Sequence, residues 1–241
     1  MRPKKYLGQH FLKNKKILRE IVEEAELSKR DIVLEVGPGH GELTEFLARR
    51  AKKVIAVEKD RELIPWLRKK FRPNKNVEIR EGDILKSKIL NLKSGYKIVA
   101  NLPYYLTSRF LRKFLEAKNK PKLMVLMVQY EVAKRICAKP PEMNLLALSV
   151  QAYAQPKFIR KVSRGNFSPP PKVDSAIIKL SNLQGSTSGA EKMLKTAKRA
   201  FQQKRKMLRH SLGVTKSDFG TKRPQELSLE DWIKISRSRK Y

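Results

Sequence analysis

Residues 31–41, Asp-Ile-Val-Leu-Glu-Val-Gly-Pro-Gly-His-Gly, join a short apolar strand to a glycine-rich turn, and a helical pattern begins at Glu42. The glycines permit a tight turn and let a ligand approach the backbone closely. Their spacing is G-x-G-x-G, whereas in the G-x-G-x-x-G pattern of dinucleotide sites the third glycine would fall at Glu42. A carboxylate there would repel a pyrophosphate. The turn therefore predicts a nucleoside ligand without phosphates, which S-adenosylmethionine fits; a turn without any ligand is the alternative.

The rest of the chain alternates short, β-branched apolar runs with helical patterns, which predicts a parallel sheet with crossover helices. We expect strands at residues 31–36, 53–58, 76–80, 97–100, 122–129, 146–153 and 176–180. We expect helices at residues 15–26, 42–51, 61–71, 108–117 and 131–138. This order predicts an α/β fold with a doubly wound, Rossmann-like, mostly parallel sheet of seven strands.

The composition changes at residues 184–189, Gln-Gly-Ser-Thr-Ser-Gly, which is typical of a flexible joint. Beyond the joint, apolar residues line one face of a long predicted helix: Leu194, Ala197, Phe201, Leu208 and Leu212. A last helix follows Pro224 and Ser228. We therefore predict two domains: residues 1–184, which bind the ligand and carry the chemistry, and residues 185–241, which form a small, basic, helical domain.

The charge is strongly unbalanced: 55 lysines and arginines stand against 23 acidic residues, a net charge of +32. Such an excess implies a polyanionic partner, with nucleic acid favoured over an anionic membrane surface. No apolar run approaches the roughly 20 residues of a spanning helix, and the start of the sequence lacks the apolar segment expected of a signal peptide. The single cysteine, Cys137, excludes an intrachain disulfide framework and a cysteine-cluster zinc site. We expect a soluble, cytoplasmic, metal-free protein that binds nucleic acid.

Two acidic residues follow the next two predicted strands. Glu58 ends the second strand, 21 positions after Gly37, where an acid can accept hydrogen bonds from both hydroxyls of a ribose. Asp83 follows the third strand and could accept from the adenine amine of the same ligand. Either acid alone is more often a solvated loop residue, but their placement after successive strands favours the ligand interpretation.

The most informative tetrapeptide is Asn101-Leu102-Pro103-Tyr104, directly after the fourth predicted strand. An exocyclic adenine amine is a poor nucleophile, because its lone pair is delocalised into the ring. The Asn101 side-chain oxygen and the Leu102 carbonyl can accept its two hydrogens, Pro103 restricts the turn, and Tyr104 can stack on the target base. The motif predicts methyl transfer to an adenine amine without a strong general base; a strand-end turn is the alternative.

Two further segments could complete the site. Residues 8–12, Gly-Gln-His-Phe-Leu, precede the first helix and could close over the ligand, although a helix lead-in is the more usual role. Residues 166–174 form a proline-rich, extended loop before the last strand. In this loop Phe167 could cover the second face of a base stacked on Tyr104; as a lone aromatic residue, it would more often belong to the core.

Together these segments resemble the ribosomal RNA adenine dimethyltransferases, the family of the bacterial kasugamycin-sensitivity methyltransferase. The similarity runs from about Tyr6 to Leu212 and rests on the ordered motifs at residues 8–12, 101–104 and 167–175. The resemblance implies a class I methyltransferase fold with a small helical C-terminal domain. It also implies dimethylation of two adjacent adenines in the 3′-terminal hairpin loop of small-subunit rRNA, and a role in ribosome biogenesis. It places cofactor contacts on His10, Leu12, Gly37, Glu58, Asp83 and Asn101, beside Gly39 of the glycine turn.

Residues 144–150 lack the Tyr-Gly that many relatives carry before the sixth strand. Sister enzymes that dimethylate one large-subunit rRNA adenine and confer macrolide resistance share the core motifs, but the triple proline and the helix near Phe201 favour the small-subunit branch. Other open readings are an RNA-binding assembly factor with secondary methylation, a basic structural protein, and a DNA adenine methyltransferase, which usually has proline in place of Leu102. We expect a monomer that acts on small-subunit rRNA or its precursor particle.

Overall fold

The computed structural model describes Lys4 and residues 8–86, 92–183, 189–214 and 219–237. The chain divides into two compact units. The first contains Met1–Ala133 and Lys157–Leu183, and the second contains Lys134–Pro156 and Gln184–Tyr241. This division differs from the predicted single boundary at residue 184, because a segment inside the first 184 residues packs with the C-terminal helices.

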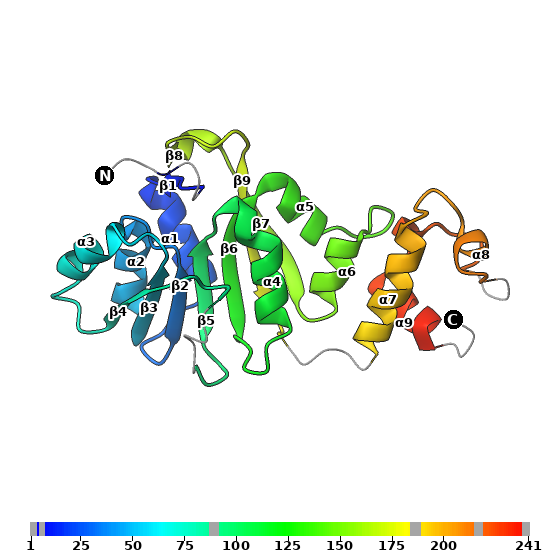
Figure 1. Ribbon diagram of the computed structural model, residues 1–241, viewed down its shortest axis with the longest axis horizontal. Coiled ribbons are helices and arrows are strands. Elements are labelled where there is room, and N and C mark those ends of the chain that lie inside the picture. The colour runs from blue at the N-terminus through cyan, green and yellow to red at the C-terminus, as the bar shows by residue number, and fades with distance from the viewer. Residues whose placement is uncertain (1–3, 5–7, 87–91, 184–188, 215–218, 238–241) are drawn as a thin grey trace. The chain divides into compact units, whose positions relative to one another are not determined.

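The first unit contains a seven-stranded sheet with the strand order β4-β3-β2-β5-β6-β9-β7. The strands are β2 (Ile32–Val36), β3 (Lys53–Glu58), β4 (Val77–Glu81), β5 (Lys97–Asn101), β6 (Leu123–Gln129), β7 (Gln155–Val162) and β9 (Ser175–Ser181). β2 pairs in parallel with β3 and β5, and further parallel pairs join β3 to β4 and β5 to β6, whereas β9 runs antiparallel to β6. The predicted α/β, mostly parallel sheet is therefore confirmed (Figure 1).

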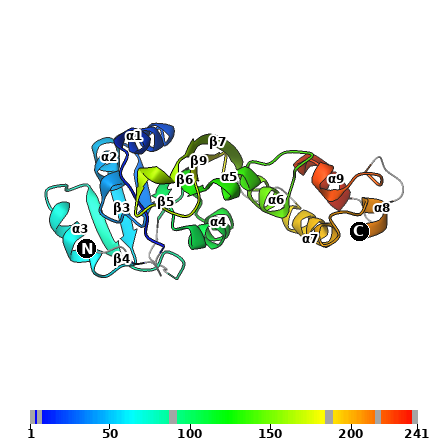
Figure 2. The ribbon, with the colours of Figure 1, turned by 90° about the horizontal axis from the view of Figure 1, so that it is seen from above.

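Helices cover both faces of this sheet, with α1 and α2 on one face and α4 on the other (Figure 2). The helices of this part of the chain are α1 (Lys15–Glu24), α2 (Glu42–Arg50), α3 (Leu63–Lys70), α4 (Thr107–Leu115) and α5 (Tyr130–Ile136). A separate two-stranded sheet pairs β1 (Phe11–Leu12) with β8 (Phe167–Ser168). The strand order reverses at the neighbours β2 and β5, and in such sheets the carboxyl ends of the strands at this point form the ligand crevice.

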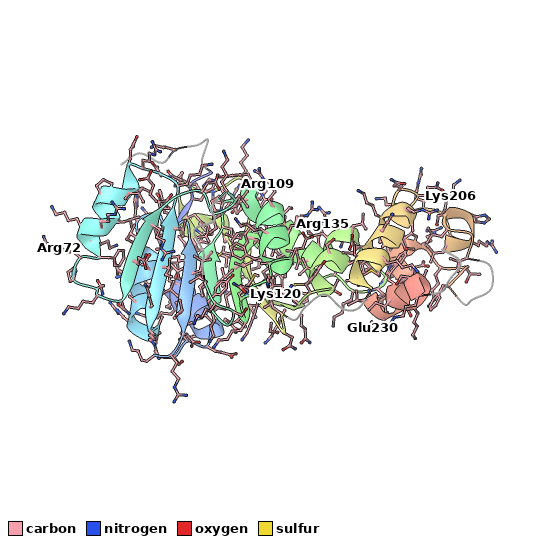
Figure 3. The ribbon with its side chains drawn as sticks, turned by 60° about the horizontal axis from the view of Figure 1, so that its bottom comes forward. Arg72, Arg109, Lys120, Arg135, Lys206 and Glu230 are labelled. Carbon is pink, nitrogen blue, oxygen red and sulfur yellow. The ribbon has the colours of Figure 1, made fainter. Side chains whose placement is uncertain are left out.

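The second unit is helical and contains α6 (Leu145–Gln151), α7 (Ala190–Phe201), α8 (Leu208–Ser211) and α9 (Leu229–Arg237). Its apolar core surrounds the fully buried Trp232 and includes Leu148, Met193 and Leu208. Exposed basic side chains occur on both units, including Arg72 and Arg109 on the first and Arg135 and Lys206 on the second (Figure 3). Within the described parts of the chain, no helix combines the length and the apolar character that a membrane span requires.

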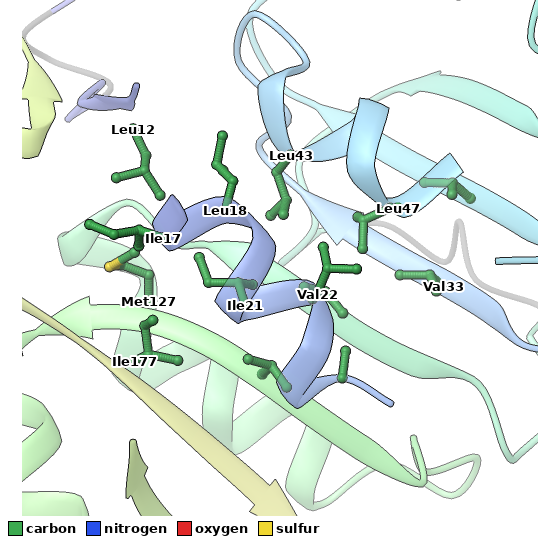
Figure 4. Packing of buried hydrophobic residues seen from close by; sticks show 14 of the residues in the cluster. Leu12, Ile17, Leu18, Ile21, Val22, Val33, Leu43, Leu47, Met127 and Ile177 are labelled. Carbon is green, nitrogen blue, oxygen red and sulfur yellow. The ribbon is translucent and has the colours of Figure 1, made fainter. Parts of the chain in front are cut away.

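Local sequence explains why α1 forms and how it packs. The Asn14 side chain caps the helix by accepting from the backbone N–H groups of Lys16 and Ile17, which supplies partners that a helix start lacks. Leu18 and Ile21 recur at helical spacing, so they fall on one buried face. This face packs into the core between the helices and the sheet (Figure 4).

Two sequence-based assignments are wrong. The run predicted as a strand at residues 146–153 is the helix α6, whose first turn is capped by Asn144 accepting from the Ala147 N–H at 3.1 Å. The sheet has seven strands because it contains β7 in place of the strand predicted at residues 146–153. The apolar pattern missed β7 because most of its side chains are exposed. The long helix predicted across residues 194–212 is interrupted after Phe201, and the chain turns before α8 begins.

A buried ion pair at the amino ends of the central strands β2 and β5 ties both strands to the end of α1. Lys97, only 6% exposed, donates from Nζ to the carbonyls of Ala25 at 2.8 Å and Glu26 at 2.5 Å, and lies 3.3 Å from an Asp31 carboxylate oxygen. Burial alone would raise the pKa of Asp31, but hydrogen bonds from Lys122 and Ser28 and the charge of Lys97 hold it well below its usual range. Lys97 therefore supplies a hydrogen-bond donor to two carbonyls at the end of α1, and Asp31 balances its charge.

We predict that Lys97→Met destabilises the protein by about 3 kcal/mol, because it leaves a buried carboxylate and two carbonyls without their shared donor. The matched control is Lys122→Met: Lys122 contacts the same Asp31 at 2.6 Å but is 52% exposed, so its loss should cost about 1 kcal/mol or less. Urea unfolding measures both. Equal losses in the two variants would contradict the role given to Lys97.

Candidate active site

One pocket in the first unit collects every residue that the sequence predicted for the site. It lies at the carboxyl ends of β2 to β5 and is closed by the β1–β8 pair. The predicted residues that line it are His10, Leu12, Gly37, Gly39, Glu58, Asp83, Asn101, Leu102, Pro103, Tyr104 and Phe167. Parallel strands bring their carboxyl ends to one edge, which explains why motifs so far apart in the sequence meet here.

The glycine turn after β2 needs glycine for two different reasons. Gly37 and Gly39 have φ angles of 67° and 60°, a region that other residues rarely adopt. A Cβ atom on Gly39 would come within 2.7 Å of the Phe11 ring, whereas one on Gly37 would meet only Pro103, at 3.9 Å. The space beside Gly39 is thus occupied by the Phe11 ring, whereas Gly37 faces open space in the pocket.

Glu58 is a buried carboxylate that organises the loops around it. Its Oε2 atom accepts from the Gly39 N–H at 3.2 Å, and its Oε1 atom accepts from Lys59 and Asp60 at 2.8 Å each. Burial raises the pKa of Glu58, although these three N–H groups oppose the shift. A carboxylate offers about four acceptor positions, so about one remains for a ligand hydroxyl.

Asp83 is held in place beside a lysine. It accepts from the Leu85 N–H at 2.9 Å and lies 3.1 Å from the Lys59 ammonium. Burial alone would raise the pKa of Asp83, but the Leu85 N–H and Lys59 lower it overall. Asp83 is therefore an ionised acceptor in the pocket wall at neutral pH.

The orientation of Asn101 follows from its neighbour. The Nδ2 atom donates to the His10 carbonyl at 3.1 Å. Because a carbonyl can only accept, the amide nitrogen must face His10, and the Oδ1 oxygen is directed elsewhere. No hydrogen bond to that oxygen occurs within the described residues. The next residue, Leu102, donates its N–H to the Met127 carbonyl at 3.1 Å, which fixes the backbone between Asn101 and Pro103.

Tyr104 is anchored at both its hydroxyl and its ring. The hydroxyl lies 2.7 Å from the Oγ of the buried Ser175, and the ring stacks against His10 with centroids 5.9 Å apart. Burial raises the pKa of the Tyr104 hydroxyl. The Nδ1 atom of His10 lies 2.9 Å from the Pro169 carbonyl, so this nitrogen carries a proton that it donates. His10 thus positions its neighbours and does not offer this nitrogen as a base.

Phe167 lines the pocket but is only 5% exposed and belongs to the apolar core. Its strand pairs with β1, placing Phe167 opposite the buried Leu12. These observations favour a core role for both side chains, and the proposed stacking of Phe167 on a base stays a prediction.

Several residues of the site had no clear sequence signal. Asp60 accepts from Lys4 at 2.7 Å and Gln9 at 2.9 Å, which ties the segment before β1 to the end of β3. Glu35 is buried and accepts from the Thr44 hydroxyl at 2.7 Å; burial raises the pKa of Glu35 to about 8. Only the position of Asp60, two residues after Glu58, could have suggested a role. The described residues contain no group of three His, Cys, Asp or Glu side chains that could hold a metal ion.

Comparison with known proteins places this geometry among RNA-modifying enzymes. Residues 1–234 match the family model described as ribosomal RNA adenine dimethylase. The ribosomal RNA small subunit methyltransferase A of Dehalococcoides mccartyi strain 195 is 44% identical over 96% of this chain and 87% of its own length. The protein of the same name from Clostridium botulinum strain Okra is 37% identical over 96% and 92%.

Solved structures agree with these matches. A dimethyladenosine transferase from Plasmodium falciparum superposes with a TM-score of 0.82 at 28% identity, covering 94% of this chain and 96% of its own. The 23S rRNA methyltransferase ErmE reaches a TM-score of 0.81 at 27% identity, covering 94% and 98%. The backbone is thus shared by an enzyme named as a dimethyladenosine transferase and by one named for 23S rRNA.

The raised pKa of Glu35 makes a prediction about stability. Between pH 4.5 and about 8 the folded protein holds a proton on Glu35 that the unfolded chain releases, so stability falls as the pH rises through this window. Glu35→Gln removes this pH dependence. The free energy of unfolding of the variant should therefore rise relative to that of the parent by up to about 1.4 kcal/mol for each pH unit across the window. Chemical denaturation at several pH values across the window measures the difference.

The control is Glu42→Gln, which removes a partly exposed carboxylate near the same turn. The charge of Glu42 is a smaller cause of the raised pKa of Glu35 than burial, so this variant should keep most of the pH dependence of the parent. If the stabilities of Glu35→Gln and its parent change in parallel as the pH is varied, Glu35 is ionised in the folded protein and the prediction is wrong.

Proposed function

The chain belongs to the ribosomal RNA adenine dimethylase family, and we propose that it dimethylates two adjacent adenines in the 3′-terminal hairpin loop of small-subunit rRNA. It is an S-adenosylmethionine-dependent rRNA adenine dimethyltransferase of class I fold that acts on the small subunit. The observation that carries the proposal is the Asn101 amide, whose nitrogen is held by His10 and whose oxygen is left for a substrate amine.

The pocket suits S-adenosylmethionine. The open space beside Gly37 admits a ligand close to the backbone. We propose that Glu58 accepts from a ribose hydroxyl through its remaining acceptor position and that Asp83 accepts from the adenine amine. Neither acid would tolerate a pyrophosphate, which agrees with a ligand that has none. When bound, S-adenosylmethionine supplies a methyl group already activated on a sulfonium.

The chain's own residues then act mainly by orientation. We propose that the Asn101 Oδ1 and the Leu102 carbonyl accept the two hydrogens of the target amine, which favours a tetrahedral nitrogen. The Tyr104 ring, held by Ser175 and His10, stacks on the target base. Pro103 fixes the turn between them. No strong general base and no metal ion are needed, because the methyl group is activated before it is bound.

The substrate explains the charge of the chain. A net charge of +32 favours binding to a phosphate backbone, and loop adenines are unpaired, so moving one into a pocket costs little. We propose that the first unit carries out methyl transfer and the second unit adds to rRNA binding. We also propose that the protein acts as a monomer, and a ribosomal substrate is consistent with work in the cytoplasm.

The alternative is a large-subunit rRNA methyltransferase, because the fold superposes equally well on ErmE. The higher identities, 37–44%, are to proteins named for the small subunit. The deciding experiment incubates ribosomal subunits that lack the modification with the protein and S-adenosylmethionine, followed by mass spectrometry of digested rRNA. We expect dimethyladenosine in the small-subunit RNA. Its appearance only in large-subunit RNA would support the alternative, and its absence from both would overturn the proposal.

We predict that Asn101→Ala lowers the rate of methyl transfer by about 10²–10³-fold, the usual effect of one oriented polar contact in a transition state. S-Adenosylmethionine affinity should change much less, because Glu58 and Asp83 remain. Single-turnover methylation of small-subunit particles at saturating cofactor measures the rate, and calorimetry measures the affinity.

The matched variant is Tyr104→Phe, which keeps the ring but removes the hydroxyl that contacts Ser175. It should retain most of the activity if stacking is the role of Tyr104. Transfer by Asn101→Ala at nearly the parent rate would show that this amide has no part in the chemistry.

A further inference from the structure

An exposed aromatic side chain in the pocket wall has no role in the chemistry described above. Tyr105 is 46% exposed and lines the pocket. The other large apolar residues exposed in the described part of the chain lie outside the pocket lining: Ile32, Trp66, Phe158 and Val173. An exposed aromatic ring at the mouth of a binding site is an unused contact surface.

Tyr105 differs from its neighbour Tyr104 in how it is held. The Tyr104 hydroxyl contacts Ser175, whereas the Tyr105 hydroxyl has no hydrogen bond within the described residues. A Cβ atom built on Gly8 would lie 3.4 Å from the Tyr105 ring. The segment before β1 therefore packs against part of the ring, and nearly half of the side chain remains open to solvent.

An arginine lies on the same face, four residues later. Tyr105 lies in the 3-10 turn Tyr104–Leu106, which continues into α4, and Arg109 lies in the first turn of that helix (Figure 3). Residues four apart in helical segments are neighbours on the surface. Arg109 is exposed, and no ion pair to it occurs within the described residues, whereas Arg112 on the same helix pairs with Glu116 at 3.4 Å.

The surroundings of this pair are positive. The charge of Arg109 acts on Lys59, which also lies near Tyr105, and Lys59 and Lys86 both act on Asp83 in the pocket wall. Lys59 and Lys86 are themselves exposed. Lys59 lines the pocket and pairs with Asp83, whereas Arg109 and Lys86 lie near this part of the wall without lining it. An open aromatic ring near cations is the combination found in surfaces that bind single-stranded nucleic acid.

We propose that Tyr105 and Arg109 bind the nucleotide next to the target adenine, with its base stacked on Tyr105 and its phosphate against Arg109. This inference rests on the proposed function, because it requires an RNA substrate. An adenine that enters the pocket leaves its neighbour without a stacking partner, and the Tyr105 ring replaces that partner. Charge complementarity favours RNA over the cofactor as the occupant, since RNA is a polyanion, whereas the sulfonium, ammonium and single carboxylate of S-adenosylmethionine give it a net positive charge.

The test compares steady-state methylation of small-subunit particles by the parent, Tyr105→Ala, Tyr105→Phe and Arg109→Ala, with S-adenosylmethionine affinity measured by calorimetry. Trp66→Ala and Arg112→Ala are the matched controls: Trp66 is an exposed aromatic residue outside the pocket lining, and Arg112 is an exposed arginine on the same helix as Arg109 that pairs with Glu116. Tyr105→Ala should raise KM for the particles about 5- to 100-fold, and Tyr105→Phe should restore it. Arg109→Ala should raise KM and reduce the log–log salt slope of binding by about 0.7.

Cofactor affinity and kcat should change little in these variants, which separates binding of the RNA from a structural defect. A KM for Tyr105→Ala equal to that of Trp66→Ala would overturn the inference while leaving the proposed function intact. Loss of cofactor affinity at unchanged KM would also overturn it, and would place Tyr105 against the cofactor adenine. A parent protein that methylates no particles would overturn the proposed function, and this inference with it.

Discussion

The buried carboxylate of Glu58 is the constraint on which the site depends. It ends β3 and accepts from the glycine turn that follows β2, as well as from its own loop. A buried carboxylate without such partners would be very costly, so the turn must stay within reach. That turn can approach only because Gly39 has no side chain, and the space is filled by Phe11, whose ring stacks on His40 with centroids 4.1 Å apart. One acid thus sets the positions of three segments.

The N-terminal segment takes part in this arrangement from two sides. Asp60 holds Lys4 and Gln9, while the His10 carbonyl orients Asn101 and the His10 ring contacts Tyr104. Asn101 and Tyr104, which are proposed for methyl transfer, are therefore positioned by His10, in the segment that directly precedes β1 and lies outside the main sheet. The side chain of Asn101, at the end of the central strand β5, thus takes its orientation from the His10 carbonyl and not from the strands on either side of β5.

Sequence alone predicted which residues meet in one pocket better than it predicted the periphery of the fold. The glycine turn, Glu58, Asp83 and the motif at Asn101 follow strands whose apolar patterns are clear, so their meeting in one pocket could be predicted. The pattern failed at β7, whose exposed side chains show no apolar alternation, and at α6, because a short apolar run fits a buried strand as well as a helix. The Lys97 cluster and the contact of Lys4 with Asp60 depend on tertiary packing, which no local pattern encodes.

The pairing of β1 with β8 has a consequence for how the protein is made. Phe11 lies opposite Ser168 and Leu12 opposite Phe167, so the pocket is closed by segments from the beginning and the end of the first unit. Chains emerge from the ribosome N-terminus first and begin to fold as they are made. Residues 11 and 12, however, have no strand to pair with until residue 168 has been synthesised. The growing chain can therefore build most of its sheet while the site stays open, and the enzyme becomes complete only late in its own translation.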